Sequence, residues 1–169
     1  QIDRRMRVEH IHFGGGTPTI MTPESFADLI GLIRHCFFVT PGAEVAIEID
    51  PRTLSSRMIE ALALGGVNRA SLGVQSFDPK VQRAINRIQS FAQTEAATIG
   101  LRRAGIFGIN FDLIYGLPHQ TVASCLDTVA RCVGSATCRI RKSSSTPQSS
   151  CSLMLPTSRS SVARASASD

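Results

Sequence analysis

Residues 8–37, "VEHIHFGGGTPTIMTPESFADLIGLIRHCF", carry the pattern on which the predicted fold rests. A run of alternating apolar residues ends in the glycines of segment 14–16, which predicts a strand that stops where the chain must turn. A helix should follow, because Thr22 is a favoured N-cap residue and Pro23 suits the first helical position. A strand that leads directly into a helix is the repeating unit of a parallel α/β sheet.

The same unit repeats along the next ninety or so residues, at a spacing of about thirty residues from strand to strand. The predicted strands cover 8–15, 43–51, 69–77 and 108–118, and the predicted helices cover 22–37, 55–66, 78–105 and 121–129. The sequence therefore predicts an α/β fold with about four parallel strands. A closing βα-barrel and an open, doubly wound sheet fit this spacing equally well, and both place ligands at the carboxyl ends of the strands.

The chain divides into two parts by composition. Residues 1–130 carry the strand and helix pattern and are neutral, with twelve basic and twelve acidic residues. Residues 131–169 are rich in serine and arginine, carry the whole net charge of +5 and show no helical or strand period, so we expect a disordered or out-of-frame tail. Because the charge lies in that tail, the first part gives no reason to expect a nucleic-acid partner.

Cysteine usage and hydropathy restrict the cellular context. The five cysteines form no CxxC pair, which favours free thiols in a reducing cytoplasm. No signal peptide and no membrane-length apolar run are present in the sequence, so we expect a cytoplasmic monomer without a membrane partner. His10 and His12 share one strand face but lack a third ligand at a usable spacing, so no metal site is expected.

Polar side chains stand at or near the carboxyl ends of three successive predicted strands. Glu48, Gln75 and Asp112 each follow an apolar run in which they alternate with buried positions. A carboxylate at the end of a buried strand is costly unless it meets a partner or a ligand. Since these strand ends converge at one edge of a parallel sheet, the sequence predicts a small-molecule site there.

The glycine run occupies the corresponding position on the first strand. It lacks both the phosphate-loop ending and the GxGxxG dinucleotide fingerprint. Glycines without Cβ atoms would let a ligand lie directly against the main chain. Arg83 and Arg87 are four residues apart on a predicted helix and hence on one face, from which Arg87 could pair with a ligand carboxylate.

Four motifs together point to a known family. The motifs are "VEHIHFGGGTPT", "IEIDPR", "ASLGVQSFDPKVQRAINR" and "NFDLIYGLPHQT". In this order, they closely resemble segments of the oxygen-independent coproporphyrinogen III oxidases, radical S-adenosylmethionine (radical SAM) enzymes of heme biosynthesis. The resemblance covers about residues 7–130 and implies a partial radical SAM (βα)-barrel, to which this chain would supply the second to fifth strands.

The resemblance also implies a set of cofactor-binding residues. The family binds two S-adenosylmethionine molecules, and its motif positions fall on Gly15, Gly16, Thr17, Glu48, Gln75, Arg87 and Asp112. It further implies a porphyrinogen substrate, whose propionate groups are oxidatively decarboxylated to yield protoporphyrinogen IX. The electron donor cannot be inferred from the sequence.

One family motif does not occur among the 169 residues. The family holds a [4Fe-4S] cluster with the thiolates of a CxxxCxxC motif, and none of the five cysteines here has that spacing. We therefore expect the isolated chain to be inactive. Two alternatives stay open from the sequence: a heme-chaperone relative that binds heme without oxidising a porphyrinogen, and a nucleic-acid-binding protein that acts through its basic tail.

Overall fold

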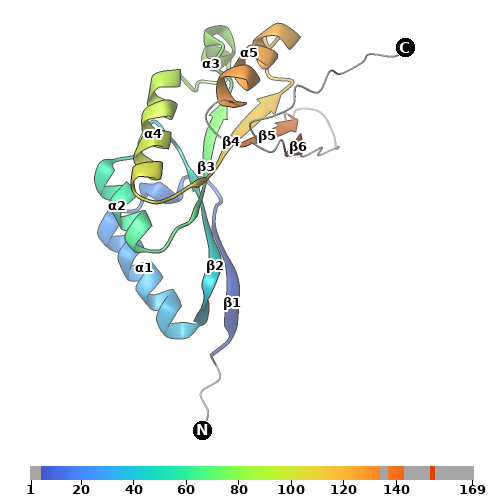
Figure 1. Cartoon of the computed structure of the whole chain (residues 1–169). Helices are drawn as coiled ribbons and strands as arrows, with labels where there is room; N and C mark the ends of the chain where they lie inside the picture. Colours follow the sequence, from blue (N-terminus) through green and yellow to red (C-terminus); the bar gives the residue numbers. More distant parts are fainter. Residues whose placement is uncertain (1–4, 134–136, 143–152, 155–169) are drawn as a thin grey trace.

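The computed structural model describes residues 5–133, 137–142 and 153–154. Strands and helices alternate from the start, as the spacing predicts (Figure 1). The strands are β1 Arg7–Phe13, β2 Phe38–Ile49, β3 Arg69–Gln75, β4 Gly108–Tyr115, β5 Thr137–Lys142 and β6 Leu153–Met154. The helices are α1 Pro23–Cys36, α2 Ser56–Leu64, α3 Pro79–Ala84, α4 Phe91–Arg103 and α5 Val122–Val133, with a single 3-10 turn at Pro18–Ile20.

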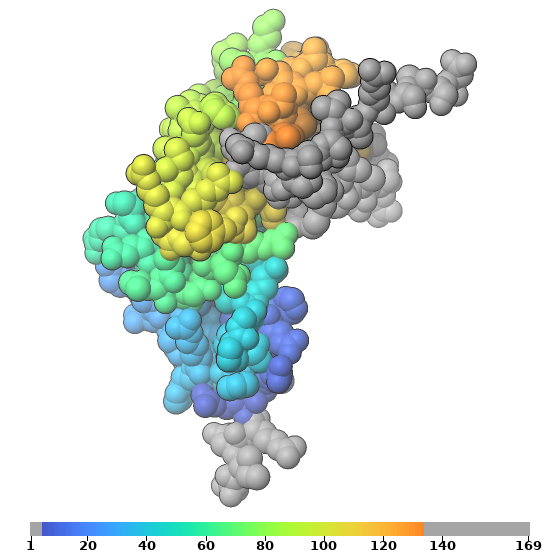
Figure 2. Space-filling model, in the orientation of Figure 1, coloured from blue at the N-terminus to red at the C-terminus, as the bar shows by residue number. Residues whose placement is uncertain are grey.

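The strands form one sheet in chain order, and β1 to β4 are parallel to one another. This confirms the predicted α/β fold with four parallel strands. Figure 2 shows the first βα unit, in blue, toward one end of the molecule and α5, in orange, toward the other. The register places Glu48 of β2 beside Ser71 of β3, and Gly73 of β3 beside Asp112 of β4.

Helices α1, α2 and α4 lie on one face of the sheet and bury its apolar side chains (Figure 1). Phe26 and Leu62 from the helices and Ile47, Leu72 and Phe111 from the strands are at most 1% exposed. Removing this apolar area from water is the main contribution to the stability of the fold. The alternate strand positions carry polar side chains, among them Glu48, Ser71 and Asp112, and these belong to the other face.

The local signals for the helix ends are confirmed. Thr22 caps α1, its side chain accepting a hydrogen bond from the Ser25 amide, with Pro23 in the first turn. Gly65 and Gly66 end α2, and the φ of 80° at Gly66 is one that glycine adopts without strain. Asp78 caps α3 through hydrogen bonds from two backbone amides.

The prediction of one continuous helix over 78–105 is wrong. Segment 78–105 forms two helices, α3 and α4, separated by the loop 85–90. Asn86 has a φ of 52°, and Ser90 opens α4 in a reciprocal capping box with Gln93. These two residues are the signals that could have revealed the break. Arg87 consequently lies in a loop, not on a shared helix face with Arg83.

Strand bounds also differ from the prediction by a few residues, and one strand was not predicted. β2 begins at Phe38, earlier than the predicted residue 43, and its pairing with β1 shifts between Val8 and His10. β5 lies in the segment that we expected to be a tail, and it pairs parallel to β4. Its sequence, "TCRIRK", alternates apolar and basic residues, which is the signal that was missed. Of segment 131–169, the structure also describes residues 131–133, which end α5, and β6; the other residues of the expected tail lie outside the described ranges.

Candidate functional site

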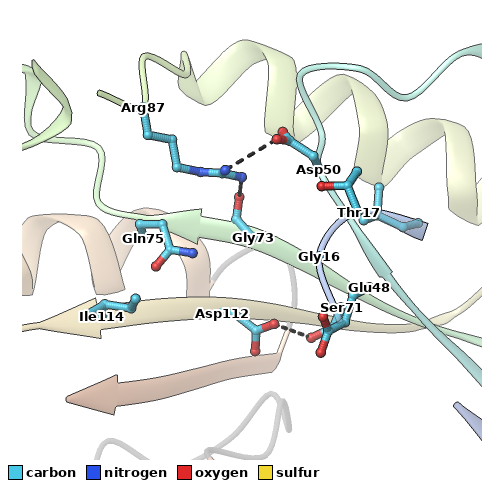
Figure 3. A pocket seen from close by; sticks show the side chains of 11 residues that line it. Gly16, Thr17, Glu48, Asp50, Ser71, Gly73, Gln75, Arg87, Asp112 and Ile114 are labelled. Atoms are coloured by element: carbon cyan, nitrogen blue, oxygen red, sulfur yellow. Dashed lines mark hydrogen bonds and ion pairs between the residues drawn. The ribbon is translucent and has the colours of Figure 1, made fainter. Parts of the chain in front are cut away.

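A pocket lies at the carboxyl ends of the parallel strands, where the sequence predicts a site (Figure 3). Its volume is about 210 Å³. Six of the seven predicted residues line it: Gly16, Thr17, Glu48, Gln75, Arg87 and Asp112. Gly15 is not among the lining residues. The remaining lining residues are Ile49, Asp50, Ser71, Gly73 and Ile114.

The glycine loop that follows β1 leaves open space beside the pocket. Gly15 and Gly16 have φ values of 87° and 114°, so both adopt conformations that other residues rarely take. A Cβ atom added at either glycine would meet no protein atom within 4 Å. The loop therefore needs glycine for its backbone conformation and exposes its main chain to any ligand that enters.

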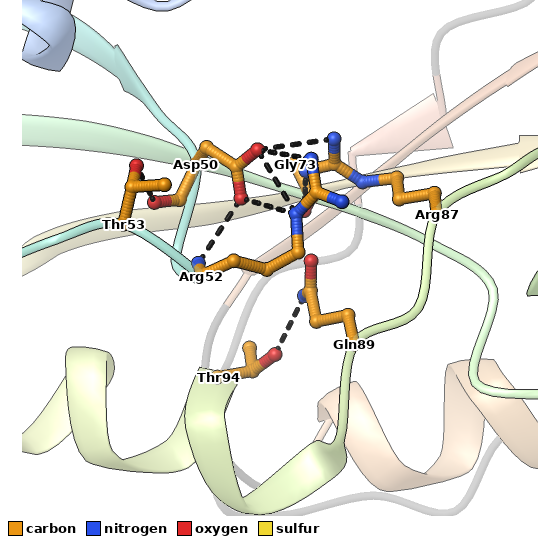
Figure 4. Close-up of polar contacts among 7 residues, drawn as sticks. All are labelled: Asp50, Arg52, Thr53, Gly73, Arg87, Gln89 and Thr94. Carbon is orange, nitrogen blue, oxygen red and sulfur yellow. Dashed lines mark hydrogen bonds and ion pairs between the residues drawn. The ribbon is translucent and has the colours of Figure 1, made fainter.

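A cluster of one carboxylate and two arginines lies at one wall of the pocket, which Asp50 and Arg87 line and Arg52 supports from outside the lining (Figure 4). We call Asp50, Arg52 and Arg87 the arginine cluster. Arg52 donates from Nε and Nη2 to the Asp50 carboxylate, with an Nη2 to Oδ2 distance of 2.6 Å, and Arg87 donates from Nη1 to Oδ2 at 3.3 Å. Burial alone would raise the pKa of Asp50. The hydrogen bonds and positive charges of the arginines outweigh burial, so the pKa of Asp50 is lowered.

Arg87 is held on both sides of its guanidinium. Its Nη2 donates to the Gly73 carbonyl oxygen at 2.9 Å, while Nη1 binds Asp50. Burial lowers the pKa of Arg87, and the charge of Asp50 opposes that change. Its Nε is buried and has no acceptor in the described part of the chain, so one donor of this arginine is still available to a ligand.

The loop that carries Arg87 is fixed by buried amides. Gln82 donates from Nε2 to the carbonyl oxygens of Ser76 and Gln89, at 2.9 Å and 2.6 Å. Gln89 in turn donates to the Thr94 hydroxyl at 2.8 Å (Figure 4). These bonds join the end of β3 to the loop and to α4, and they hold Arg87 in reach of the pocket.

The opposite wall is made of acceptors. We call Glu48, Gln75 and Asp112 the acceptor wall. Gln75 Oε1 and Asp112 Oδ1 are buried, and no donor for either lies among residues 5–133. Glu48 lies beside His12, whose Nε2 is 3.5 Å from Oε1. Buried acceptors without donors are costly, so this wall suits a ligand that supplies N–H or O–H groups.

Gln75 is held in an unusual backbone conformation. Its φ is 67°, and the pairing between β3 and β4 shifts between Gly73 and Gln75. A left-handed conformation at a residue with a side chain costs about 1–2 kcal/mol. Strain of this kind concentrates at ligand sites, because the surroundings must hold it in place.

The structure adds residues that sequence reasoning did not select. Asp50 lies two positions after Glu48, and Gly73 two positions before Gln75, but neither was predicted as a site residue. Ser71 was not considered, although it lies two positions before Gly73 and so shares its face. The period of two along β3 is the signal that could have found it.

The described ranges hold neither a metal-binding cluster nor a membrane-spanning helix. Residues 5–133, 137–142 and 153–154 contain no group of three or more His, Cys, Asp or Glu side chains that could hold a metal ion. No helix in that part of the chain is both long enough and apolar enough to cross a bilayer.

Comparisons with known proteins agree on one family. Residues 1–132 match the Radical SAM superfamily. The chain is 75% identical over 130 residues to the "Oxygen-independent coproporphyrinogen III oxidase" of Bradyrhizobium diazoefficiens, covering 77% of this chain and 29% of that protein. It is 53% identical over 133 residues to "Uncharacterized protein y4hJ" of Sinorhizobium fredii, covering 79% of this chain and 51% of that protein.

A solved structure gives the same result. The coproporphyrinogen III oxidase of Escherichia coli, described as a radical SAM enzyme, superposes with a TM-score of 0.76 at 36% identity, over 80% of this chain and 32% of that one. The chain thus spans between about a third and a half of the length of these relatives. From the family match, the sheet and the pocket at its carboxyl edge, we conclude that this chain belongs to the radical SAM superfamily.

Proposed function

We propose that this chain is the S-adenosylmethionine-binding portion of an oxygen-independent coproporphyrinogen III oxidase. That oxidoreductase would convert coproporphyrinogen III to protoporphyrinogen IX by oxidative decarboxylation in heme biosynthesis. The single observation that supports this most is the pocket, in which residues from the glycine loop and from β2, β3 and β4 meet at one edge of the sheet. The names of the Bradyrhizobium and Escherichia relatives supply the substrate.

The residues present fit S-adenosylmethionine chemically. The cofactor carries an ammonium group and ribose hydroxyls, which are donors for the acceptors Gln75 Oε1 and Asp112 Oδ1. Its sulfonium and ammonium charges suit a wall that holds the carboxylates of Glu48 and Asp112. Its carboxylate is an acceptor for the unused Nε of Arg87.

The glycine loop completes the proposed binding surface. The main chain of Gly15, Gly16 and Thr17 would lie against the cofactor, since no protein atom occupies the space beside the two glycines. When bound beside an iron–sulfur cluster, the cofactor supplies hydrogen-atom abstraction from a substrate carbon. The residues of this chain bind and orient it, and the pocket excludes bulk water from Asp112 Oδ1.

We propose that the cysteine ligands of the iron–sulfur cluster are not among these 169 residues. None of the five cysteines has the CxxxCxxC spacing. We propose that this chain alone, after reconstitution with iron and sulfide, gives no turnover of coproporphyrinogen III. We also propose that the complete enzyme is a cytoplasmic monomer. The heme-chaperone and nucleic-acid alternatives gain no support from the named relatives.

A chimera tests the proposal. The 130 matched residues of the Bradyrhizobium protein are replaced by those of this chain, and conversion of coproporphyrinogen III is assayed anaerobically. We expect activity close to that of the parent, and a loss of at least about tenfold when Asp112→Asn is added. A folded chimera that contains its cluster but has no oxidase activity would overturn the proposal.

A further inference from the structure

Ser71 lies between the two carboxylates of the acceptor wall. It is 8% exposed and lines the pocket from the middle of β3. Across one side of β3 it is in register with Glu48 of β2. Across the other side, Asp112 of β4 is in register with Gly73, two residues further along β3. A single hydroxyl group therefore has two negatively charged neighbours, and it has one proton to donate.

That proton goes to Asp112. The Ser71 hydroxyl donates to Asp112 Oδ2 at 2.7 Å, a distance at the long end of the range for a hydroxyl bound to an ionised carboxylate. Figure 3 shows the two side chains pointing toward each other across the strands. Asp112 Oδ1 has no donor in the described part of the chain. One carboxylate oxygen is thus used by the protein, and one is left for a ligand.

The neighbouring position on β3 is kept clear. Gly73 lies opposite Asp112 in the sheet, and a Cβ atom there would be 3.0 Å from Arg87 Nη2 and 3.7 Å from Gln75 Nε2. A side chain at this position would crowd the Arg87 guanidinium, whereas its distance from Gln75 is an ordinary contact. Glycine here therefore leaves room for Arg87 beside the strand.

Glu48 is held by a different partner. Its Oε1 lies 3.5 Å from His12 Nε2, and no hydrogen bond joins it to Ser71. The two carboxylates of the wall are therefore not equivalent: one is oriented by a short bond from a buried hydroxyl, and the other lies beside a half-exposed imidazole.

We propose that Ser71 is a positioning residue for ligand binding: its hydroxyl occupies Asp112 Oδ2 and so presents Oδ1 as the one acceptor that Asp112 offers to a ligand donor. This rests on the proposed binding of S-adenosylmethionine. Without the hydroxyl, the carboxylate would be free to rotate and either oxygen would compete for the ligand. Affinity would fall because the free protein must then order the carboxylate on binding.

Calorimetric titration of the 169-residue chain with S-adenosylmethionine tests this. Ser71→Ala should weaken binding about threefold to tenfold, the range for one lost hydrogen bond. Ser71→Thr keeps a hydroxyl and should bind within about threefold of the parent chain. Thr98→Val is the matched control, because the buried Thr98 hydroxyl donates to the Thr94 carbonyl oxygen within α4 and lies outside the pocket lining.

A second background separates positioning from a general effect on the fold. In the Asp112→Ala chain, Ser71→Ala should cause little further loss, because the carboxylate that Ser71 positions is absent. An equal loss in both backgrounds would overturn the proposal, and so would parent-like affinity of Ser71→Ala. If Ser71→Ala does not fold, Ser71→Cys, with its weaker donor, takes its place with the same expectation.

The parent chain provides the remaining distinction. If the folded parent shows no saturable binding, the proposed function fails, and the role of Ser71 fails with it. If the parent binds and Ser71→Ala binds equally well, only the role of Ser71 is wrong.

Discussion

The two walls of the pocket differ in how their polar groups are satisfied. In the arginine cluster, both oxygens of Asp50 accept hydrogen bonds from arginine side chains of the chain itself. In the acceptor wall, Gln75 Oε1 and Asp112 Oδ1 are buried without donors among the described residues. The carboxylate of the first wall is satisfied as folded, and only Arg87 Nε there lacks a partner among the described residues, whereas the acceptors of the second wall gain their donors only from a ligand. Both walls contain polar residues that line the pocket, and only their hydrogen bonds distinguish them.

This difference assigns them different roles. The arginine cluster joins the end of β2 to the end of β3 and to the loop 85–90, so its main contribution is to the free energy of unfolding. The acceptor wall lowers stability slightly in the free chain and favours binding. Substitutions in the two walls should therefore show opposite patterns of lost stability and lost affinity.

Asp50→Ala should give the largest effect on folding. It leaves Arg52 and Arg87 without their shared carboxylate, and we expect a loss of about 2–3 kcal/mol in the free energy of unfolding, measured by urea denaturation. Glu24→Ala is the control, because the Glu24–Arg57 pair is exposed, and its loss should be far smaller. Equal losses would mean that the arginine cluster is not structural.

Asp112→Asn should show the reverse pattern. Because a charged acceptor is removed from the acceptor wall, we expect S-adenosylmethionine affinity to fall about tenfold to a hundredfold. The free energy of unfolding should change by less than about 1 kcal/mol. Calorimetric titration and urea denaturation of the same preparation give both numbers, and a large loss of stability without a loss of affinity would contradict the distinction between the walls.

The arginine cluster should also give a specific pH dependence. The pKa of Asp50 is lowered in the folded chain, since its arginine partners outweigh its burial. The stabilisation of the folded chain by the Asp50 carboxylate is therefore present in full above the pKa of an unfolded aspartate, about 3.9. It is lost as pH falls through the lower pKa of the folded chain. The stability difference between the parent and Asp50→Asn, measured by urea denaturation, should be constant from about pH 5 to 7 and shrink below about pH 4. A difference that stays constant to lower pH would show that the charge of Asp50 is unimportant.

Gln75 gives the smallest effect and the finest test. Gln75→Gly and Gln75→Ala both remove the acceptor, so both should weaken S-adenosylmethionine binding, as calorimetric titration would show. Only glycine relieves the strain of the φ of 67°, and the glycine variant should be more stable than the alanine variant by about 1 kcal/mol in urea denaturation. Equal stabilities would show that this conformation is not strained.

The sequence anticipated the parts of the site that follow from strand period. Glu48, Gln75 and Asp112 converge as predicted, because alternation and parallel pairing determine which side chains reach the carboxyl edge. The division of the pocket into two walls could not be predicted. It depends on the register that places Ser71 beside Glu48, on the loop that brings Arg87 to Asp50, and on the left-handed turn at Gln75.

The loop 85–90 shows why the position of Arg87 could not be predicted from the sequence. The helical pattern predicted one helix over 78–105, with Arg87 on its face. The chain instead leaves α3 at Ala84, where the buried side-chain amide of Gln82 donates to the Gln89 carbonyl oxygen and accepts from the Gln89 backbone N–H. Those bonds join side chains to the backbone of a loop, and no periodic pattern reports them.

The most direct test of the two-wall account is calorimetric titration of the 169-residue chain with S-adenosylmethionine, run in parallel on the Gln75→Ala/Asp112→Asn double variant. The account predicts saturable binding to the parent and a loss of more than about tenfold in the variant, with cooperative unfolding retained in both. The absence of saturable binding to a folded parent chain, or equal affinity in the double variant, would contradict it.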